Sequence, residues 1–280
     1  MSERFLSMVM CVGLCVTALA RAEALPVPSG DAAGQALLDS PRHGEWADVP
    51  MGEGQPPVRT WVVYPERADA APVVIVVHEI FGLTDWIRSV ADALAAAGYI
   101  AVAPDLLSGR GPDGKGTEGF EGDAVRAAVR GLADDEVVAR LNAVRDYALK
   151  LPAAAKRSAV IGFCWGGSTA FTYAGAQGEL EASVVYYGTG PQDVEVARRI
   201  ACPVLGLYGE DDARVTATVP ATTQAMADAG RRFEPITYAR AGHGFLRQQD
   251  GREGANAAAA TQAWAATLTF LKAHLEPKPD

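Results

Sequence analysis

Short apolar runs alternate with longer segments of helical periodicity along most of the chain. The clearest run covers residues 72–77, a continuous β-branched stretch typical of a central parallel strand that is buried on both faces. Further strands are predicted at residues 58–64, 99–103, 158–161, 182–187, 204–208 and 233–238. Helices are predicted at 86–97, 168–177, 219–229 and 255–275, together with a helical region from 123 to 150 that is broken near 131–134.

This alternation of strands and helices predicts the fold class. Crossover helices between parallel strands favour an α/β protein with a mostly parallel twisted sheet and helices on both faces. One such domain is expected over residues 58–275, followed by a short tail at 276–280. Residues 23–57 are rich in Pro, Gly and Ala and are interpreted as an arm or linker, and the glycine-rich segment 106–122 as a loop over the strand ends.

The first 22 residues have the pattern of a secretory signal peptide. Arg4 precedes an apolar run over residues 5–20, and Ala20-Arg21-Ala22 matches a cleavage site. The run is short for a retained membrane anchor. The sequence therefore predicts an exported protein, with periplasm and external medium both open as destinations.

The composition of the chain limits the kinds of molecule that it is expected to bind. The chain has 280 residues, 49% of them apolar, which is enough for a substantial core. Removal of Glu3, Arg4 and Arg21 with the signal peptide changes the formal net charge from −9 to −10, and no Lys/Arg block is present. An acidic surface argues against nucleic acid or an anionic membrane as partner. We expect a monomer that acts on a small molecule.

Two cysteines remain after signal removal, Cys164 and Cys202. In an exported protein they could form a disulfide. Cys164 follows one predicted strand and Cys202 precedes another, which places them at opposite edges of a parallel sheet, so no disulfide is expected. Cys202 is interpreted as core packing.

Cys164 lies in Gly162-x-Cys164-x-Gly166, between a predicted strand and a predicted helix. This spacing is typical of a nucleophile elbow, a strained turn that exposes its central side chain above the sheet. The flanking glycines would provide clearance for the turn. The usual occupant is serine, and a buried cysteine after a strand is often only core filler, so the interpretation depends on partners elsewhere.

Polar residues follow four of the predicted strands. Ligands bind beyond the carboxyl ends of parallel strands, so these residues are expected to converge. The order nucleophile, acid, histidine is that of an α/β-hydrolase triad. His243, in a glycine-flanked turn, is the favoured base, and His78 is its rival. Asp212 is the favoured acid, with Asp211 as the alternative and Glu210 as a weaker one.

Glu79 ends a buried strand, and a carboxylate there could hold the Cys164 thiol in its neutral form, which resists oxidation. A helix cap or a surface ion pair is the structural alternative for Glu79. An oxyanion hole is expected from the backbone N–H groups of Trp165, after the nucleophile, and of Ile80.

Taken together, these segments resemble the dienelactone hydrolase family over residues 58–275. The motifs that carry the resemblance are His78-Glu79-Ile80-Phe81-Gly82-Leu83, Ala103-Pro104-Asp105-Leu106, Gly162-Phe163-Cys164-Trp165-Gly166-Gly167, Tyr186-Tyr187-Gly188, Tyr208-Gly209-Glu210-Asp211-Asp212 and Gly242-His243-Gly244-Phe245. The resemblance implies an α/β-hydrolase fold and a Cys164-His243-Asp212 triad with Glu79 as partner of the resting thiol. It also implies hydrolysis of 4-carboxymethylenebut-2-en-4-olide to maleylacetate through an acyl-enzyme, without metal or organic cofactor.

Substrate binding follows from the same resemblance. Two arginines hold the substrate carboxylate in the family; Arg247 matches one of them, and Arg110 and Arg126 are candidates for the second. Tyr187 is the further expected substrate-binding residue. Two other functions remain open, a broad carboxylesterase or thioesterase with the same triad, and a non-catalytic scaffold that binds a small molecule or a protein.

Overall fold

A computed structural model describes residues 27–276; the signal peptide prediction lies outside this range. Within it, eight strands form one sheet in the order β1-β2-β4-β3-β5-β6-β7-β8. The strands are β1 (Gly44–Val49), β2 (Val58–Val63), β3 (Ala71–Val77), β4 (Ile100–Pro104), β5 (Ala154–Phe163), β6 (Ala182–Tyr186), β7 (Val204–Gly209) and β8 (Phe233–Tyr238). Strands β4, β3 and β5 to β8 are parallel, whereas β2 is antiparallel to both β1 and β4.

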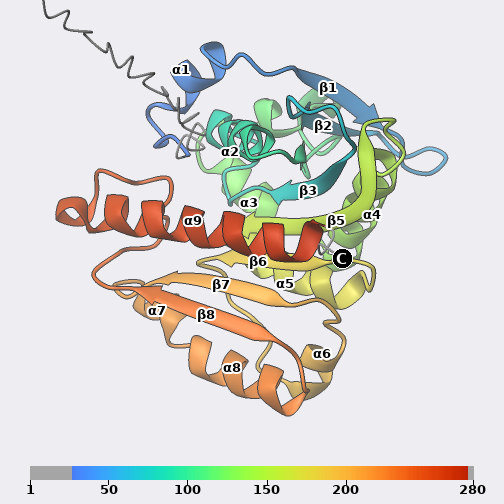
Figure 1. Cartoon of the computed structure of the whole chain (residues 1–280). Helices are drawn as coiled ribbons and strands as arrows, with labels where there is room; N and C mark the ends of the chain where they lie inside the picture. The colour runs from blue at the N-terminus through green and yellow to red at the C-terminus, as the bar shows by residue number, and fades with distance from the viewer. Residues whose placement is uncertain (1–26, 277–280) are drawn as a thin grey trace, which may run out of the picture.

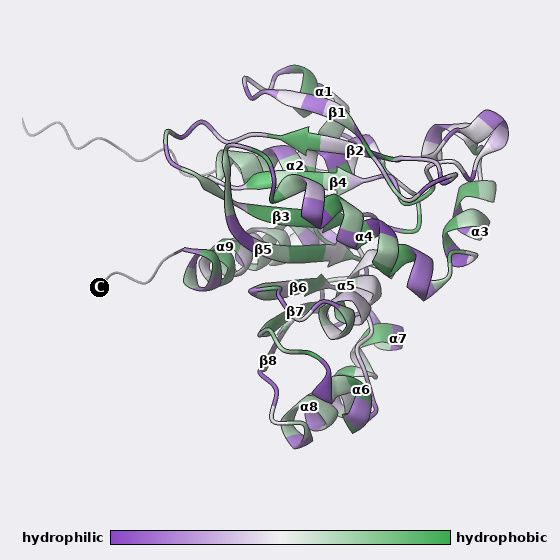
Figure 2. Cartoon of the chain, turned by 90° about the vertical axis from the view of Figure 1, so that its right-hand side faces the viewer, coloured by the Kyte–Doolittle hydropathy of each residue, from purple (hydrophilic) through white to green (hydrophobic). Residues whose placement is uncertain are grey.

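Helices cover both faces of this sheet (Figure 1). They are α1 (Ala33–Leu38), α2 (Asp85–Ala96), α3 (Ala124–Arg130), α4 (Asp134–Ala148), α5 (Trp165–Ala176), α6 (Val194–Arg198), α7 (Ala213–Thr216), α8 (Val219–Asp228) and α9 (Ala255–Leu275). Residues of α2 and α9 pack in one core layer, and residues of α4, α5 and α8 in the other. Figure 2 shows the hydrophobic strands β3 and β5 in the middle of these layers. The predicted fold class is confirmed.

The complete burial of the central strands explains why the sequence predicts them. Every residue of β3, β4, β6 and β7 is buried, so each strand needs an unbroken apolar run. The break predicted near 131–134 is present, because α3 ends at Arg130 and α4 begins at Asp134. By contrast, β5 begins at Ala154, four residues before the predicted start, since residues 154–157 are only partly buried and carry no apolar run.

The segment interpreted as an arm contributes to the domain. Its strand β1 pairs with β2 and forms the edge of the sheet, although half of its residues are exposed and give little apolar signal. Further upstream, the Gly30 N–H donates to the Arg247 carbonyl at 2.8 Å, and Trp86 Nε1 donates to the Pro28 carbonyl at 3.1 Å. The arm is therefore bonded both to the turn that carries Arg247 and to α2.

The loop after β4 is tied down by one buried carboxylate. Asp105 accepts hydrogen bonds from the Thr117 hydroxyl at 2.7 Å and from the Thr117 N–H at 2.6 Å, and the same hydroxyl accepts from the Leu83 N–H at 3.0 Å. These bonds hold the loop, which contains short 3₁₀ turns at Pro112–Gly114 and Thr117–Gly119, over the strand ends. Between residues 27 and 276, no helix has the length and apolarity to cross a membrane.

Candidate active site

Cys164 occupies the turn between β5 and α5 with φ 58° and ψ −115°. This positive φ is unfavourable for a residue with a Cβ, and such strain persists where the surroundings enforce it. A Cβ on Gly162 would collide with the carbonyl oxygen of Gly166, and a Cβ on Gly166 with the carbonyl oxygen of His78. The two flanking glycines therefore permit the elbow, as the sequence indicated.

His243 and Asp212 meet beside this elbow. His243 Nδ1 donates to Asp212 Oδ2 at 2.5 Å, and the Asp212 side chain is 6% exposed. The aspartate lies three residues after the end of β7, and the histidine lies in the loop after β8, which pairs in parallel with β7. Sheet register thus brings together two residues 31 positions apart in the chain.

The alternatives to these two residues have other partners. Asp211 is half-exposed and pairs with Arg252 at 3.0 Å, while Glu210 accepts from the Arg240 N–H. His78 is fully buried, stacks on Trp165 at 5.5 Å and has its Nδ1 2.7 Å from the Glu79 carbonyl oxygen. Burial lowers the pKa of His78 despite the nearby Asp105.

Charge favours a protonated imidazole at position 243. Burial by itself lowers the pKa of His243, but hydrogen bonds to Asp212 and to Cys164 outweigh it and raise the pKa to about 9. The imidazole thus pairs with the Asp212 carboxylate, and the nearby Cys164 thiol adds to the rise of its pKa. A sulfur that transfers its proton to this imidazole forms a thiolate–imidazolium pair, the nucleophilic state of a cysteine.

Two residues of the same hollow carry backbone N–H groups without an acceptor among residues 27–276. These residues are Ile80 and Trp165. Trp165 is the first residue of α5, where backbone N–H groups are unsatisfied within the helix and the helix dipole is positive. These two donors can stabilise an oxyanion that develops next to the sulfur.

Glu79 has a different partner from the one expected. Its carboxylate, 2% exposed, accepts from Arg247 Nε at 2.6 Å, and no hydrogen bond joins it to Cys164 among the described residues. Burial raises the pKa of the Glu79 carboxyl, whereas the charge and the hydrogen bond of Arg247 act against that rise. Glu79 is therefore an ion-pair partner of Arg247, and the carboxylate-binding role expected of Arg247 is occupied by a residue of the protein itself.

The structure places the two candidates for a second substrate-binding arginine in different surroundings. Arg126 and Arg247 each lie 5.0 Å from the centre of the Phe81 ring, and Arg126 also pairs with Asp123 at 3.0 Å. Arg110 instead binds Glu136, a residue of α4. Of the two candidates for a second arginine, the structure thus brings Arg126 beside Arg247 and places Arg110 elsewhere.

The hollow over Cys164 has a volume of about 480 Å³. Tyr187 lines it and packs at 5.1 Å from the His243 ring, with φ 41° after β6. Its hydroxyl is buried and has no hydrogen-bond partner among residues 27–276, and burial raises its pKa well above the usual value. Arg130 and Arg214 also line the hollow. The sequence analysis missed both, although Arg214 lies only two residues after Asp212.

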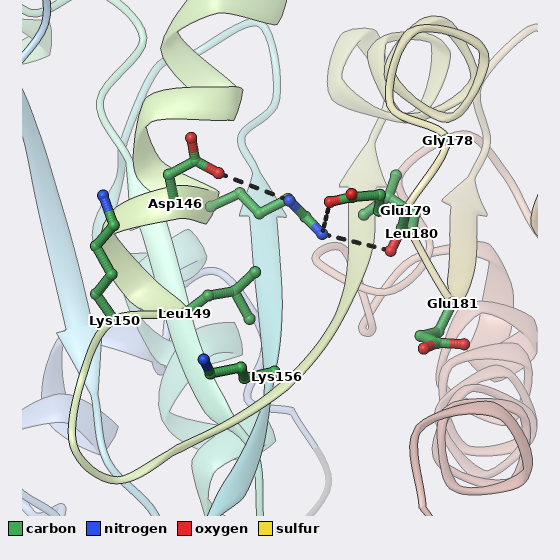
Figure 3. Close-up of a pocket in the computed structure, with 9 residues that line it drawn as sticks. Asp146, Leu149, Lys150, Lys156, Gly178, Glu179, Leu180 and Glu181 are labelled. Carbon is green, nitrogen blue, oxygen red and sulfur yellow. Dashed lines mark hydrogen bonds and ion pairs between the residues drawn. The ribbon is translucent and has the colours of Figure 1, made fainter.

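A larger hollow of about 750 Å³ lies where β5 and β6 begin, at the end of the sheet opposite Cys164. Figure 3 shows Asp146 and Lys150 on one side of it and Glu179 and Glu181 on the other. Arg145 spans it and pairs with Glu179 at 3.0 Å, so its charges are largely compensated. It contains no cysteine, serine or histidine, whereas the smaller hollow contains the strained Cys164.

Cys164 and Cys202, the cysteines in the described part of the chain, are both free. Burial raises the pKa of the Cys202 thiol to about 12, in keeping with a packing role. Among residues 27–276, no cluster of His, Cys, Asp and Glu has the arrangement of a metal site. The candidate active site is thus built from a sulfur, an imidazole, a carboxylate and two N–H donors.

Comparison with known proteins places this site in a family. Residues 58–275 match the model of the dienelactone hydrolase family. A protein of Escherichia coli K12 provisionally named a carboxymethylenebutenolidase is 34% identical over 219 residues, which are 74% of this chain and 79% of that protein. Carboxymethylenebutenolidase 1 of Cupriavidus pinatubonensis is 31% identical over 212 residues, 75% of this chain and 89% of its own.

A solved structure supports the same family. A crystal structure from Klebsiella pneumoniae, described as a provisional dienelactone hydrolase, superposes with a TM-score of 0.71 at 30% identity and covers 82% of this chain and 98% of its own. The family model covers the segment that carries the elbow, the acid and the histidine. This chain belongs to the dienelactone hydrolase family.

Proposed function

We propose that this protein is an exported cysteine-dependent hydrolase of carboxylic esters or lactones, with carboxymethylenebutenolidase activity on 4-carboxymethylenebut-2-en-4-olide. The observation that carries the proposal is the 2.5 Å pair of His243 and Asp212 near Cys164, whose hollow is also lined by two residues with N–H groups that have no acceptor between residues 27 and 276. The family and its named relatives support the substrate class. The pattern of residues 1–22 supports export.

In the acylation step the Cys164 thiolate attacks the carbonyl carbon, and the C–S bond forms while the carbonyl π electrons move to oxygen. The N–H groups of Ile80 and Trp165 stabilise this oxyanion. When the carbonyl re-forms, the bond to the ester oxygen breaks, and that oxygen takes the proton of the His243 imidazolium. In a lactone the leaving oxygen stays attached to the acyl group through the opened ring.

Hydrolysis of the thioester reverses these roles. Neutral His243 removes a proton from water, which attacks the thioester carbonyl; the same N–H groups stabilise the second oxyanion. Collapse expels the Cys164 thiolate and releases the carboxylic acid product. Asp212 accepts the Nδ1–H throughout, so it fixes the imidazole orientation and stabilises the imidazolium.

The test is the hydrolysis of dienelactone and of 4-nitrophenyl acetate by the wild type and by Cys164→Ala and Cys202→Ala. We expect loss of turnover only in Cys164→Ala, since Cys202 is buried away from the hollow. Mass spectrometry of rapidly quenched reactions is expected to detect an acyl adduct on the peptide that contains Cys164. Wild-type turnover by Cys164→Ala would refute the assignment of the nucleophile.

A broad carboxylesterase with the same triad is the second candidate, and one observation favours it. Arg247 is bound to Glu79 and does not line the Cys164 hollow, so the arginine expected to select a carboxylate is engaged within the protein. Comparison of kcat/KM on dienelactone and on neutral short-chain esters decides between the two. A higher value for the neutral esters would favour the carboxylesterase.

A further inference from the structure

A further hollow, called here the α5 hollow, adjoins the one around Cys164. Its volume is about 460 Å³, and it is lined mainly by α5, by the segment that follows β6 and by α6. Ser168 and Thr189 line both hollows, and their hydroxyl oxygens lie 3.0 Å apart. The Ser168 N–H donates to the Cys164 carbonyl at 3.2 Å, so this contact lies one helical turn from the nucleophile. The two spaces therefore meet at the hydrogen-bonded pair of Ser168 and Thr189.

One face of α5 forms a wall that begins at the nucleophile. Cys164 is the N-cap residue of α5, and Ser168, Phe171 and Gly175 follow it four, seven and eleven positions later. Residues at these spacings lie on the same side of a helix. With a rise of about 1.5 Å per residue, Gly175 lies about 16 Å from Cys164 along the axis. The α5 hollow therefore extends away from the sulfur along this face.

The floor of the α5 hollow is apolar. Phe171 and Ile200 line it and are 3% and 1% exposed, and Val196 of α6 adds a large hydrophobic side chain that is 49% exposed. The two charged residues of the lining, Asp134 and Arg199, are both exposed to solvent. A hollow of this size and lining binds apolar groups, because their burial removes them from water.

Gly175 keeps part of this hollow empty. A Cβ on Gly175 would lie 3.7 Å from Ile200 Cγ1 and 3.8 Å from Arg199 Cβ, which is ordinary contact. A Cβ on Gly190, by contrast, would collide with Phe171 Cζ at 2.8 Å. Packing therefore explains the glycine at 190 but not the one at 175, where alanine would favour the helix. A ligand that occupies the α5 hollow would explain it.

We propose that the α5 hollow binds the acyl chain of the substrate and selects esters with an unbranched apolar acyl group of medium length. The inference deepens the proposed hydrolase function and rests on it. The leaving oxygen takes its proton from His243, and the lining of the α5 hollow includes no residue of the loop that carries His243. The acyl chain is therefore the part of the ester that extends along α5. A short acyl group stays beside Cys164, and a longer one passes Ser168 and Thr189.

The first experiment compares kcat/KM for 4-nitrophenyl acetate, butanoate, hexanoate and octanoate. Gly175→Leu fills the α5 hollow from one wall, and Val196→Asp places a charge on the other. Gly178→Leu is the matched control, because Gly178 has open space around it and lines the hollow at the opposite end of the sheet.

In the wild type we expect kcat/KM to rise by about fourfold for each methylene added between butanoate and octanoate, because each is buried. In Gly175→Leu and Val196→Asp the loss on octanoate is expected to exceed the loss on acetate by about tenfold or more. Gly178→Leu is expected to keep the wild-type profile. A wild-type profile that is flat or falls with chain length, or equal losses on acetate and octanoate in both variants, would overturn the proposal. So would a dimer that Gly175→Leu dissociates without a change in this profile, since a second copy would then fill the hollow.

The second experiment does not depend on hydrolysis. Octyl and methyl methanethiosulfonate both convert the Cys164 thiolate into a mixed disulfide and release methanesulfinate, and they differ only in the chain that they attach. Peptide mass spectrometry separates Cys164 from the buried Cys202. We expect Gly175→Leu to lower the octyl-to-methyl rate ratio at Cys164 severalfold, and Gly178→Leu to leave it unchanged. An unchanged ratio in Gly175→Leu would refute the acyl-chain site even where esters are hydrolysed. A lowered ratio without turnover of any ester would support the site and refute the hydrolase alone.

Discussion

Replacement of Asp212 by Asn tests how charge is arranged around His243. The substitution keeps the size of the side chain and removes the carboxylate that accepts from Nδ1 at 2.5 Å. Asp211→Asn is the matched control: this neighbouring aspartate is exposed and pairs with Arg252 instead. Both variants remove one negative charge, so a difference between them reports the contact with the imidazole.

The magnitude follows from the pKa of His243. Its rise from 6.5 to about 9 corresponds to about 3 kcal/mol in favour of the imidazolium. Asp212 and Cys164 share this stabilisation, and water screens part of it because the imidazole is 33% exposed. Loss of Asp212 is therefore expected to lower the pKa of His243 by about one unit.

The assay is the pH dependence of kcat/KM with a neutral short-chain alkyl ester, whose alkoxide leaving group must take a proton. In the wild type, activity is expected to fall as pH rises through about 9, because the leaving oxygen needs the proton of the imidazolium. Asp212→Asn is expected to shift this fall to lower pH by about one unit and to reduce kcat by about 10² to 10⁴, since the imidazole loses its orientation. Asp211→Asn is expected to match the wild type.

Stability gives a second readout of the same contact. The folded-state pKa of His243 is raised above 6.5, so the protonated imidazole stabilises the fold fully below that pH. This contribution is lost as pH rises through about 9. The Tm of the wild type is expected to fall between about pH 6.5 and 9. The Tm of Asp212→Asn is expected to change less over the same range. In the kinetic assay, a fall of kcat/KM that occurs at the same alkaline pH in Asp212→Asn as in the wild type would refute the reasoning.

Three further predictions concern the surroundings of the site. Gly162→Ala is expected to lower the free energy of unfolding in urea by about 1–3 kcal/mol, because its Cβ meets the Gly166 carbonyl, whereas Gly178→Ala, with open space around it, is expected to have little effect. Arg247→Met is expected to lower the free energy of unfolding by about 3–5 kcal/mol, because it leaves the Glu79 carboxylate buried without its partner. Part of that loss is expected to disappear at acidic pH, where Glu79 binds a proton. The control Arg252→Met breaks an exposed pair and is expected to lower the free energy of unfolding by less than about 1 kcal/mol. Tyr187→Phe removes a buried hydroxyl without a partner, so unfolding is expected to require equal or higher urea, while kcat/KM falls if that hydroxyl donates to substrate; a marked loss of stability would mean that the hydroxyl has a partner.

Local sequence determined the fold class and most of its elements. Strands such as β3 and β7 are buried along their whole length, so their apolar runs reveal them without tertiary information. The helix α9 was predicted with the bounds that the structure has, Ala255–Leu275. The glycine spacing around Cys164 also identified the elbow, because the collisions that exclude a Cβ there arise within one strand–turn–helix unit and the strand beside it.

Only the tertiary structure decided which charged groups meet. The sequence favoured Asp212 but left Asp211 open, and the pairing of β7 with β8 brings Asp212 to His243. The sequence analysis assigned Glu79 to the thiol and Arg247 to substrate, whereas the fold pairs them with each other across 168 positions. Arg130 and Arg214 drew no notice because an arginine on a short helix is ordinary until the fold turns it toward a nucleophile. Backbone preference acts between near neighbours and can be read locally, but electrostatic partnership depends on distances that the chain sets only after it has folded.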